Sequence, residues 1–137
     1  MTLVDSSVWI DLFADRETRQ VDRLRRMISA RERVVVGDVV IAEVLQGARN
    51  ERAAAAMEAD LALFDIVRVV DPVSAAAAAR HYRRLRALGF TPRKTIDTLI
   101  ATRCILDNTP LLFADRDFHP FVEHLKLRSA LDDTELN

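Results

Sequence analysis

Residues 2–11 read Thr2-Leu3-Val4-Asp5-Ser6-Ser7-Val8-Trp9-Ile10-Asp11, a short apolar run that ends on a carboxylate and passes directly into a helix-like pattern. A buried strand that delivers one acidic side chain to the edge of a sheet has this pattern. We expect Ser6 to cap the following helix, because its hydroxyl can accept a hydrogen bond from the unpaired N–H groups of the first turn. A cap made by Asp5 itself is the alternative. Why a charge lies at this strand end must be answered from the rest of the chain.

Three later apolar runs resemble the first, and helical patterns separate them. Further strands are expected at residues 33–37, 66–70 and 111–113, with a last edge strand at 125–128. Helices are expected at 21–28, 50–64 and 95–106, with a short element at 119–124. Two more have clear boundary signals: one runs from a cap at Asp38 to Gly47, and the other starts at Asp71-Pro72 and ends at Gly89.

Short buried strands that alternate with helices form βαβ units and a parallel sheet. We therefore predict a single α/β domain with a parallel central sheet of four to five strands and helices on both faces. The domain is expected to cover residues 1–131, and residues 132–137 a polar C-terminal tail. A chain of 137 residues suits one domain with one core.

Composition narrows the function classes. The net charge of -1 provides no broad basic surface for a nucleic acid, so a polyanion would have to bind a local patch. The single cysteine, Cys104, excludes a disulfide within the chain, argues against a cysteine-based zinc site and fits a reducing, cytoplasmic location. No apolar run approaches the roughly 20 residues that span a membrane.

Acidic residues follow the ends of predicted strands. Asp5 follows the first strand, and Asp115 and Asp117 follow the fourth, at the sheet edge where open α/β folds form their ligand sites. Glu43 and Asp97 lie on helices among apolar neighbours, where a charge needs a partner. If these carboxylates converge, their repulsion calls for a cation, and an all-oxygen ligand set selects Mg²⁺ or Mn²⁺. Such a site suits phosphodiester cleavage by metal-activated water.

Each acid also has a purely structural explanation. Asp5 can cap a helix, Glu43 can be a solvated helix residue, Asp97 can complement the helix dipole, and Asp115 and Asp117 can be turn residues. The ordered set, with its matched strand-end positions, is harder to explain this way than any one member.

Four stretches carry the acids: Val4-Asp5-Ser6-Ser7-Val8-Trp9-Ile10-Asp11, Glu43-Val44-Leu45-Gln46-Gly47-Ala48-Arg49, Thr95-Ile96-Asp97-Thr98-Leu99-Ile100-Ala101 and Leu111-Leu112-Phe113-Ala114-Asp115-Arg116-Asp117-Phe118. In this order, over nearly the full chain, they resemble the PIN-domain ribonucleases, and specifically the VapC-type toxins of toxin–antitoxin pairs. One departure is Phe113, where relatives often carry a polar residue.

The resemblance implies that Asp5, Glu43, Asp97 and Asp115 form the catalytic metal site, with Asp117 as a further or alternative ligand. It also implies a Mg²⁺-dependent endoribonuclease, with transfer RNA as the substrate class. The expected partners are a second copy of the chain, in a homodimer, and a small VapB-like antitoxin whose tail occludes the site. Ser6 matches the small hydroxyl residue that the family has beside the first acid.

Basic residues close in sequence to the acids are candidate RNA contacts. Arg93, Lys94 and Arg116 are expected to bind phosphates, together with Ser6. Other functions stay open: a phosphatase with an aspartyl nucleophile, a receiver-like signalling module, or a binding module with an idle site. The phosphatase usually has a second acid where Ser7 stands, and the receiver needs adjacent acids after the first strand.

Overall fold

The central sheet has four parallel strands in a computed structural model that describes residues 1–131. The strands lie in the order β3-β2-β1-β4, with Leu3 paired to Val35 on one side and to Leu111 on the other. Their bounds are β1 Thr2–Val4, β2 Val34–Gly37, β3 Asp65–Val67 and β4 Leu111–Leu112. The predicted α/β class and parallel sheet are confirmed, and the expected tail at 132–137 lies outside the described residues.

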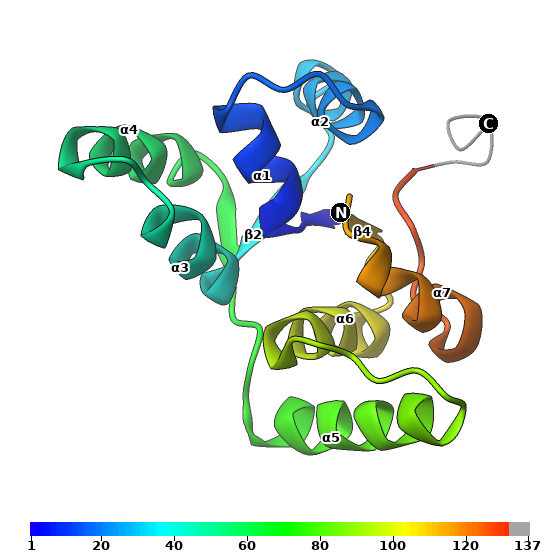
Figure 1. The fold of residues 1–137 in the computed structure, drawn as a ribbon. Helices are drawn as coiled ribbons and strands as arrows, with labels where there is room; N and C mark the ends of the chain where they lie inside the picture. Colours follow the sequence, from blue (N-terminus) through cyan, green and yellow to red (C-terminus); the bar gives the residue numbers. More distant parts are fainter. Residues whose placement is uncertain (132–137) are drawn as a thin grey trace.

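Seven α-helices and one 3₁₀ turn are described around the sheet. They are α1 Ser6–Phe13, α2 Arg19–Ser29, α3 Asp38–Gln46, α4 Glu51–Leu61, α5 Pro72–Ala87, α6 Thr95–Asp107, η1 Arg116–Phe118 and α7 His119–Leu125. Helices α1 to α4 gather on one side of the strands and α5 to α7 on the other (Figure 1). The prediction of helices on both faces is therefore confirmed. None of these helices is long and apolar enough to cross a membrane.

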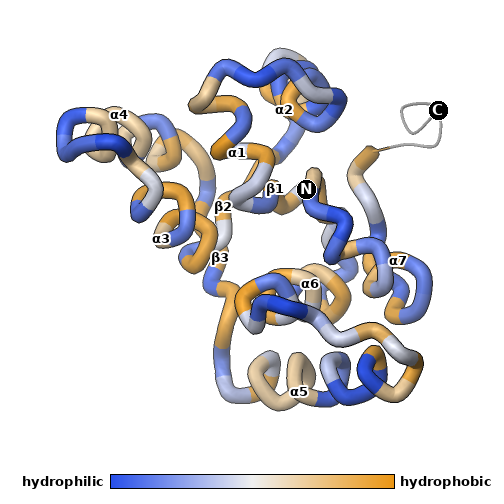
Figure 2. Tube along the Cα trace, viewed as in Figure 1, coloured by the Kyte–Doolittle hydropathy of each residue, from blue (hydrophilic) through white to orange (hydrophobic). Residues whose placement is uncertain are grey.

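The core consists of the strands and the inner faces of the helices. Val4, Val35 and Leu112 are fully buried, as expected for strands covered on both faces. Trp9, on α1, is also buried and packs edge-on against Phe64. Coloured by hydropathy, the tube is hydrophobic along much of α3, and hydrophobic and hydrophilic stretches alternate along α6 (Figure 2).

The expected edge strand at 125–128 is wrong. No strand is described at 125–128 within residues 1–131, and one isolated bridge joins Leu111 to Ser129, just after the predicted segment. Lys126 takes a left-handed conformation that ends α7, and β4 is only two residues long. Leu111 makes both hydrogen bonds of the bridge, by donating to the carbonyl of Arg128 and accepting from the N–H of Ala130, each at 2.9 Å.

Two predicted helix caps are also wrong. Asp5, not Ser6, caps α1 by accepting the N–H of Ser7 at 3.1 Å. Gly37, not Asp38, is the N-cap of α3, because β2 runs into the helix without a turn. The carboxylate of Asp38 instead accepts the N–H of Val69 at 3.0 Å.

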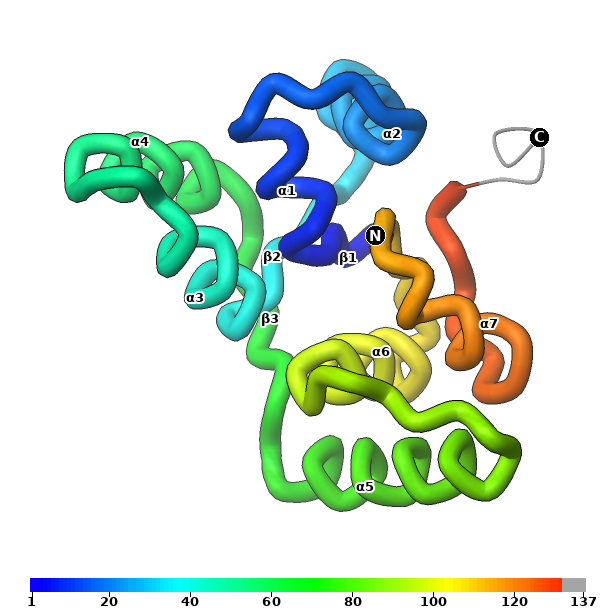
Figure 3. Tube along the Cα trace, in the orientation of Figure 1, coloured from blue at the N-terminus to red at the C-terminus, as the bar shows by residue number. Residues whose placement is uncertain are grey.

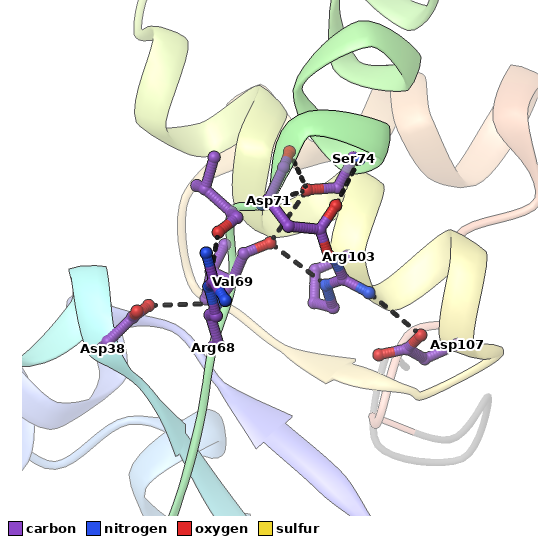
Figure 4. Close-up of polar contacts among 8 residues, drawn as sticks. Asp38, Arg68, Val69, Asp71, Ser74, Arg103 and Asp107 are labelled. Atoms are coloured by element: carbon purple, nitrogen blue, oxygen red, sulfur yellow. Dashed lines mark hydrogen bonds and ion pairs between the residues drawn. The ribbon is translucent and has the colours of Figure 1, made fainter.

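The third strand is shorter than predicted, because the backbone groups after Val67 form hydrogen bonds with side chains instead of with a neighbouring strand (Figure 4). The carbonyl of Val69 accepts a hydrogen bond from Nε of Arg103 at 3.0 Å. Arg103 also pairs with Asp71 at 2.9 Å and with Asp107 at 3.2 Å. Asp71 caps α5 in a reciprocal capping box with Ser74, as the Asp71-Pro72 start predicted. This network fixes α6 against the connection between β3 and α5.

Candidate metal centre

The topology brings the ends of three strands to one edge of the sheet, here called the carboxyl edge. Asp5 follows β1, Asp115 follows β4, and α3, which carries Glu43, follows β2. Helix α6 leads back into β4, so its first turn, with Asp97, lies at the same edge. Figure 3 shows β1 in blue beside the orange segment that contains β4, which lies more than a hundred residues later in the sequence.

Three of the predicted acids form a compact cluster. Asp97, Asp115 and Asp117 each offer a carboxylate oxygen, and these three oxygens lie within 4.8 Å of one another. Asp5 and Glu43 fall outside this trio but act on it electrostatically, because the charges of both raise the pKa of Asp97. The expected metal site consisted of Asp5, Glu43, Asp97 and Asp115, with Asp117 as a further or alternative ligand. The observed trio instead includes Asp117 and leaves Asp5 and Glu43 outside.

The carboxylate of Asp5 has two different oxygens. Oδ2 accepts both the N–H of Ser7 and its hydroxyl, at 3.1 and 2.6 Å. Oδ1 is buried and has no hydrogen-bond partner among the residues described. Oδ2 therefore fixes the orientation of the carboxylate, and Oδ1 can still coordinate a ligand.

Ser7 is a positioning residue that sequence reasoning missed. Its hydroxyl donates to Asp5 and accepts the N–H of Ala114 at 3.3 Å, so it joins the first and fourth acidic stretches directly. The available signal was a serine two residues after a strand-end aspartate, a spacing at which side chains commonly bond local backbone. That spacing does not reveal the contact with Ala114.

Ser6 positions a different acid. It is buried in the first turn of α1, and its hydroxyl donates to Oε1 of Glu43 on α3 at 3.0 Å. The two adjacent serines therefore orient two carboxylates that lie far apart in the sequence.

Burial sets the electrostatics of the centre. It is the largest cause that raises the pKa of Asp97 to about 7, followed by the charge of Asp5, while Lys94 lowers it. Burial also raises the pKa of Asp5 and of Glu43, against hydrogen bonds from Ser7 and Ser6 that lower them. Gathering these carboxylates therefore costs free energy unless a positive charge neutralises them.

The residues fit a hard divalent cation. Oδ2 of Asp97, like Oδ1 of Asp5, is buried without a hydrogen-bond partner in the described part of the chain. Every candidate ligand atom is a carboxylate oxygen, the type that Mg²⁺ and Mn²⁺ prefer. Unpaired buried oxygens beside further carboxylates are what a cation site requires.

The predicted basic residues lie around this centre. Arg93 holds the carboxylate of Asp117 with two hydrogen bonds of 3.1 Å, and Lys94 is close enough to lower the pKa of Glu43 and Asp97. Arg116 is exposed on η1. The histidines have other surroundings: His81 hydrogen-bonds to Thr102 at 2.8 Å, and the rings of His119 and His124 pack against phenylalanines.

Comparisons with known proteins point to one family. Residues 2–121 match the model of the family described as "PIN domain". The chain is 28% identical over 131 residues to VapC ribonuclease Mb1587 of Mycobacterium bovis and to ribonuclease VapC11 of Mycobacterium tuberculosis, covering 95% of this chain and 98% of each relative.

Two solved structures share the fold. A structure of VapBC2 from Rickettsia felis, bound to a DNA fragment from their promoter, aligns with a TM-score of 0.72 at 14% identity, over 93% of this chain and 96% of that one. A toxin–antitoxin complex from Klebsiella pneumoniae aligns with a TM-score of 0.62 at 20% identity, over 86% and 90%.

Proposed function

We propose that this chain, which belongs to the PIN domain family, is the ribonuclease toxin of a VapBC-type toxin–antitoxin pair. The observation that carries the proposal is the acidic cluster at the carboxyl edge, together with the buried oxygens of Asp5 and Asp97 that have no hydrogen-bond partner within residues 1–131. The match along nearly the whole chain to VapC ribonucleases supports the reaction class. The nuclease domain is residues 1–131.

The cofactor in this proposal is Mg²⁺, with Mn²⁺ as a substitute. Asp5, Glu43, Asp97 and Asp115 are the catalytic set that holds it, and Asp117 is a further or alternative ligand. When bound, such an ion supplies an activated water and positive charge beside the scissile phosphodiester. The chain's own contribution is orientation: Ser7 fixes Asp5, and Ser6 fixes Glu43.

The substrate is RNA, with transfer RNA as the favoured class. Because the net charge is -1, the phosphates must be bound locally. Arg93, Lys94 and Arg116, which surround the acids, are the candidate contacts, with Ser6 beside the first acid. The protein acts in the cytoplasm as a homodimer, and a small VapB-like antitoxin inhibits it.

Cleavage by purified protein tests the catalytic set. Asp97→Asn is expected to lower the rate of RNA cleavage in Mg²⁺ by about a hundred-fold or more, since metal catalysis contributes several kcal/mol. Asp5→Asn should do the same, while the matched control Asp60→Asn, on the exposed outer part of α4, should cleave like the wild type. Full activity in folded Asp97→Asn would remove the proposed site.

Expression in cells tests the toxin role. The wild-type chain should arrest growth, and co-expression of the neighbouring small reading frame should relieve the arrest. Mapping the 5′ ends of cleaved cellular RNA then identifies the substrate. Arrest that persists in Asp5→Ala would contradict toxicity by RNA cleavage.

A further inference from the structure

A cavity of about 270 Å³ adjoins the acidic cluster. One wall comes from the end of α5 and the loop after it, including Leu85, Phe90 and Pro92. The other comes from η1 and α7, with Asp117 and Phe121. Asp117 belongs both to this wall and to the acidic trio, so the cavity opens beside the proposed metal centre.

The sequence at the end of α5 fixes the position of Phe90. Gly89 has φ +97°, a left-handed conformation that glycine adopts readily, and its N–H donates to the carbonyl of Arg86 at 3.0 Å. The N–H of Phe90 donates to the carbonyl of Leu85 at 2.9 Å. These two bonds form a Schellman motif, which brings the residue after the glycine against the last turn of the helix. Phe90 is thus set into the wall by backbone geometry.

Further contacts hold the walls in place. The ring of Phe90 packs against that of His124 with centroids 5.2 Å apart. The Arg93–Asp117 ion pair, with its shortest contact at 3.0 Å, joins the loop to η1. The phenylalanine nevertheless keeps 39% of its surface exposed, which is enough to present an aromatic surface to a ligand.

The lining suits a flat, partly apolar ligand better than a phosphate. Phe90, Pro92 and Pro120 keep exposed surface and make part of the lining apolar, with the fully buried Leu85 and Phe121 behind them, and the carboxylate of Asp117 repels an anion. Arg116 adds a guanidinium, which can stack on a planar ring or donate hydrogen bonds to its edge. The volume is below the range of about 300–1,000 Å³ for drug-sized ligands, so it suits one ring system.

We propose that this cavity binds one nucleobase of the RNA, adjacent to the scissile phosphate, and that Phe90 stacks on that base. The subsite rests on the proposed ribonuclease function, because the strand reaches the cavity only if its phosphate lies at the acidic cluster. Stacking accepts many bases, and Arg116 and Asp117 at the edge provide the preference for one of them.

Cleavage of an RNA pool with randomised positions, in Mg²⁺, tests the subsite. Sequencing the ends should show a base preference of the wild-type protein at one position within about two nucleotides of the cut. In Phe90→Ala that preference should flatten, and kcat/KM on the preferred RNA should fall about ten-fold, the usual loss for one stacked base. Mn²⁺ binding measured by electron paramagnetic resonance should not change, because Phe90 lies outside the acids.

Two variants sharpen the result. Phe90→Leu keeps an apolar side chain but removes the ring, so it should behave like Phe90→Ala. It takes the place of Phe90→Ala if the alanine variant unfolds at a lower temperature than the wild type. Retained preference in Phe90→Leu would reduce the cavity to an apolar contact and overturn the proposal. The matched control Leu88→Ala truncates an exposed apolar residue outside the cavity and should cleave like the wild type.

Failure of the subsite differs from failure of the proposed function. An unchanged preference and kcat/KM in Phe90→Ala would remove the subsite alone. No metal-dependent cut anywhere in the pool by the wild-type protein would remove the ribonuclease function, and the subsite with it.

Discussion

Asp97 lies in the first turn of α6, where the helix dipole favours a carboxylate, yet its pKa is raised to about 7. Burial outweighs the dipole, because only 6% of the residue is exposed. At the residue scale, the gathered carboxylates therefore destabilise the folded protein unless a proton or a cation neutralises them.

This destabilisation predicts that the stability of the metal-free protein depends on pH. The pKa of Asp97 is about 7 in the folded protein against an ordinary value of 3.8, so the folded state binds the proton more tightly. Between these values the unfolded chain holds fewer protons, and the free energy of unfolding should fall as pH rises from about 4 to about 7. Urea unfolding in EDTA at pH 5, 6 and 7 measures the slope. It should be shallower in Asp97→Asn, and equal slopes would contradict the burial of a charged Asp97.

We expect Arg93 to compete with the proposed cation for Asp117, because its guanidinium donates to both carboxylate oxygens. Arg93→Gln should tighten Mn²⁺ binding to the RNA-free protein about two- to five-fold, as expected for loss of one largely exposed ion pair. The effect should disappear in an Asp117→Asn background, which calorimetric titration of all four proteins would reveal.

The matched control for that titration is Arg33→Gln. It also breaks an exposed ion pair, with Asp65 at 3.3 Å, but at the start of β2, on the sheet edge opposite the acids. Its Mn²⁺ affinity should equal that of the wild type. A similar gain there would mean that general charge, not the Arg93–Asp117 pair, sets the affinity.

At the scale of elements, Arg103 connects α6 to the segment that follows β3 (Figure 4). Its side chain is only 15% exposed, so its hydrogen bonds are shielded from water. Arg103→Met should lower the free energy of unfolding by about 2 kcal/mol, mainly because the Val69 carbonyl loses a charged donor. Urea unfolding measures this, and Arg33→Met, at an exposed pair, should change it by less than about 0.5 kcal/mol.

At the scale of the whole molecule, α5 and α6 leave a groove of about 340 Å³ on the outer surface. Ala75, Ala78, Ala79 and Tyr82 line it at helical spacing, with Leu99 from α6. The first half of α5 is hydrophobic in Figure 2, and Val73 is 73% exposed. This face is where we expect the proposed homodimer to form.

A charge in the groove should separate the proposed dimer. Ala79→Glu is expected to give a monomer by size-exclusion chromatography with light scattering, because an unpaired carboxylate would be buried between the copies. Ala76→Glu, on the exposed part of α5 outside the groove, should remain dimeric. A wild-type protein that is monomeric at the same concentration would refute the homodimer.

Local signals in the sequence predicted most of the fold and the acids of the candidate centre. The buried strand runs, the Asp71-Pro72 start and Gly89 act within a few residues, so the chain alone reveals them. Where a prediction failed, as with the caps at Ser6 and Asp38, a side chain had found a distant partner instead: Glu43 for Ser6 and Val69 for Asp38.

By itself, the sequence determined the alternation of strands and helices and the four acidic stretches, because both depend on residue type and short spacing. Only the tertiary structure decided that Ser7 joins Asp5 to Ala114, that Arg93 holds Asp117, and that burial raises the pKa of Asp97 to about 7. These properties depend on distances between remote segments and on the exclusion of water. Neither exists until the chain has folded.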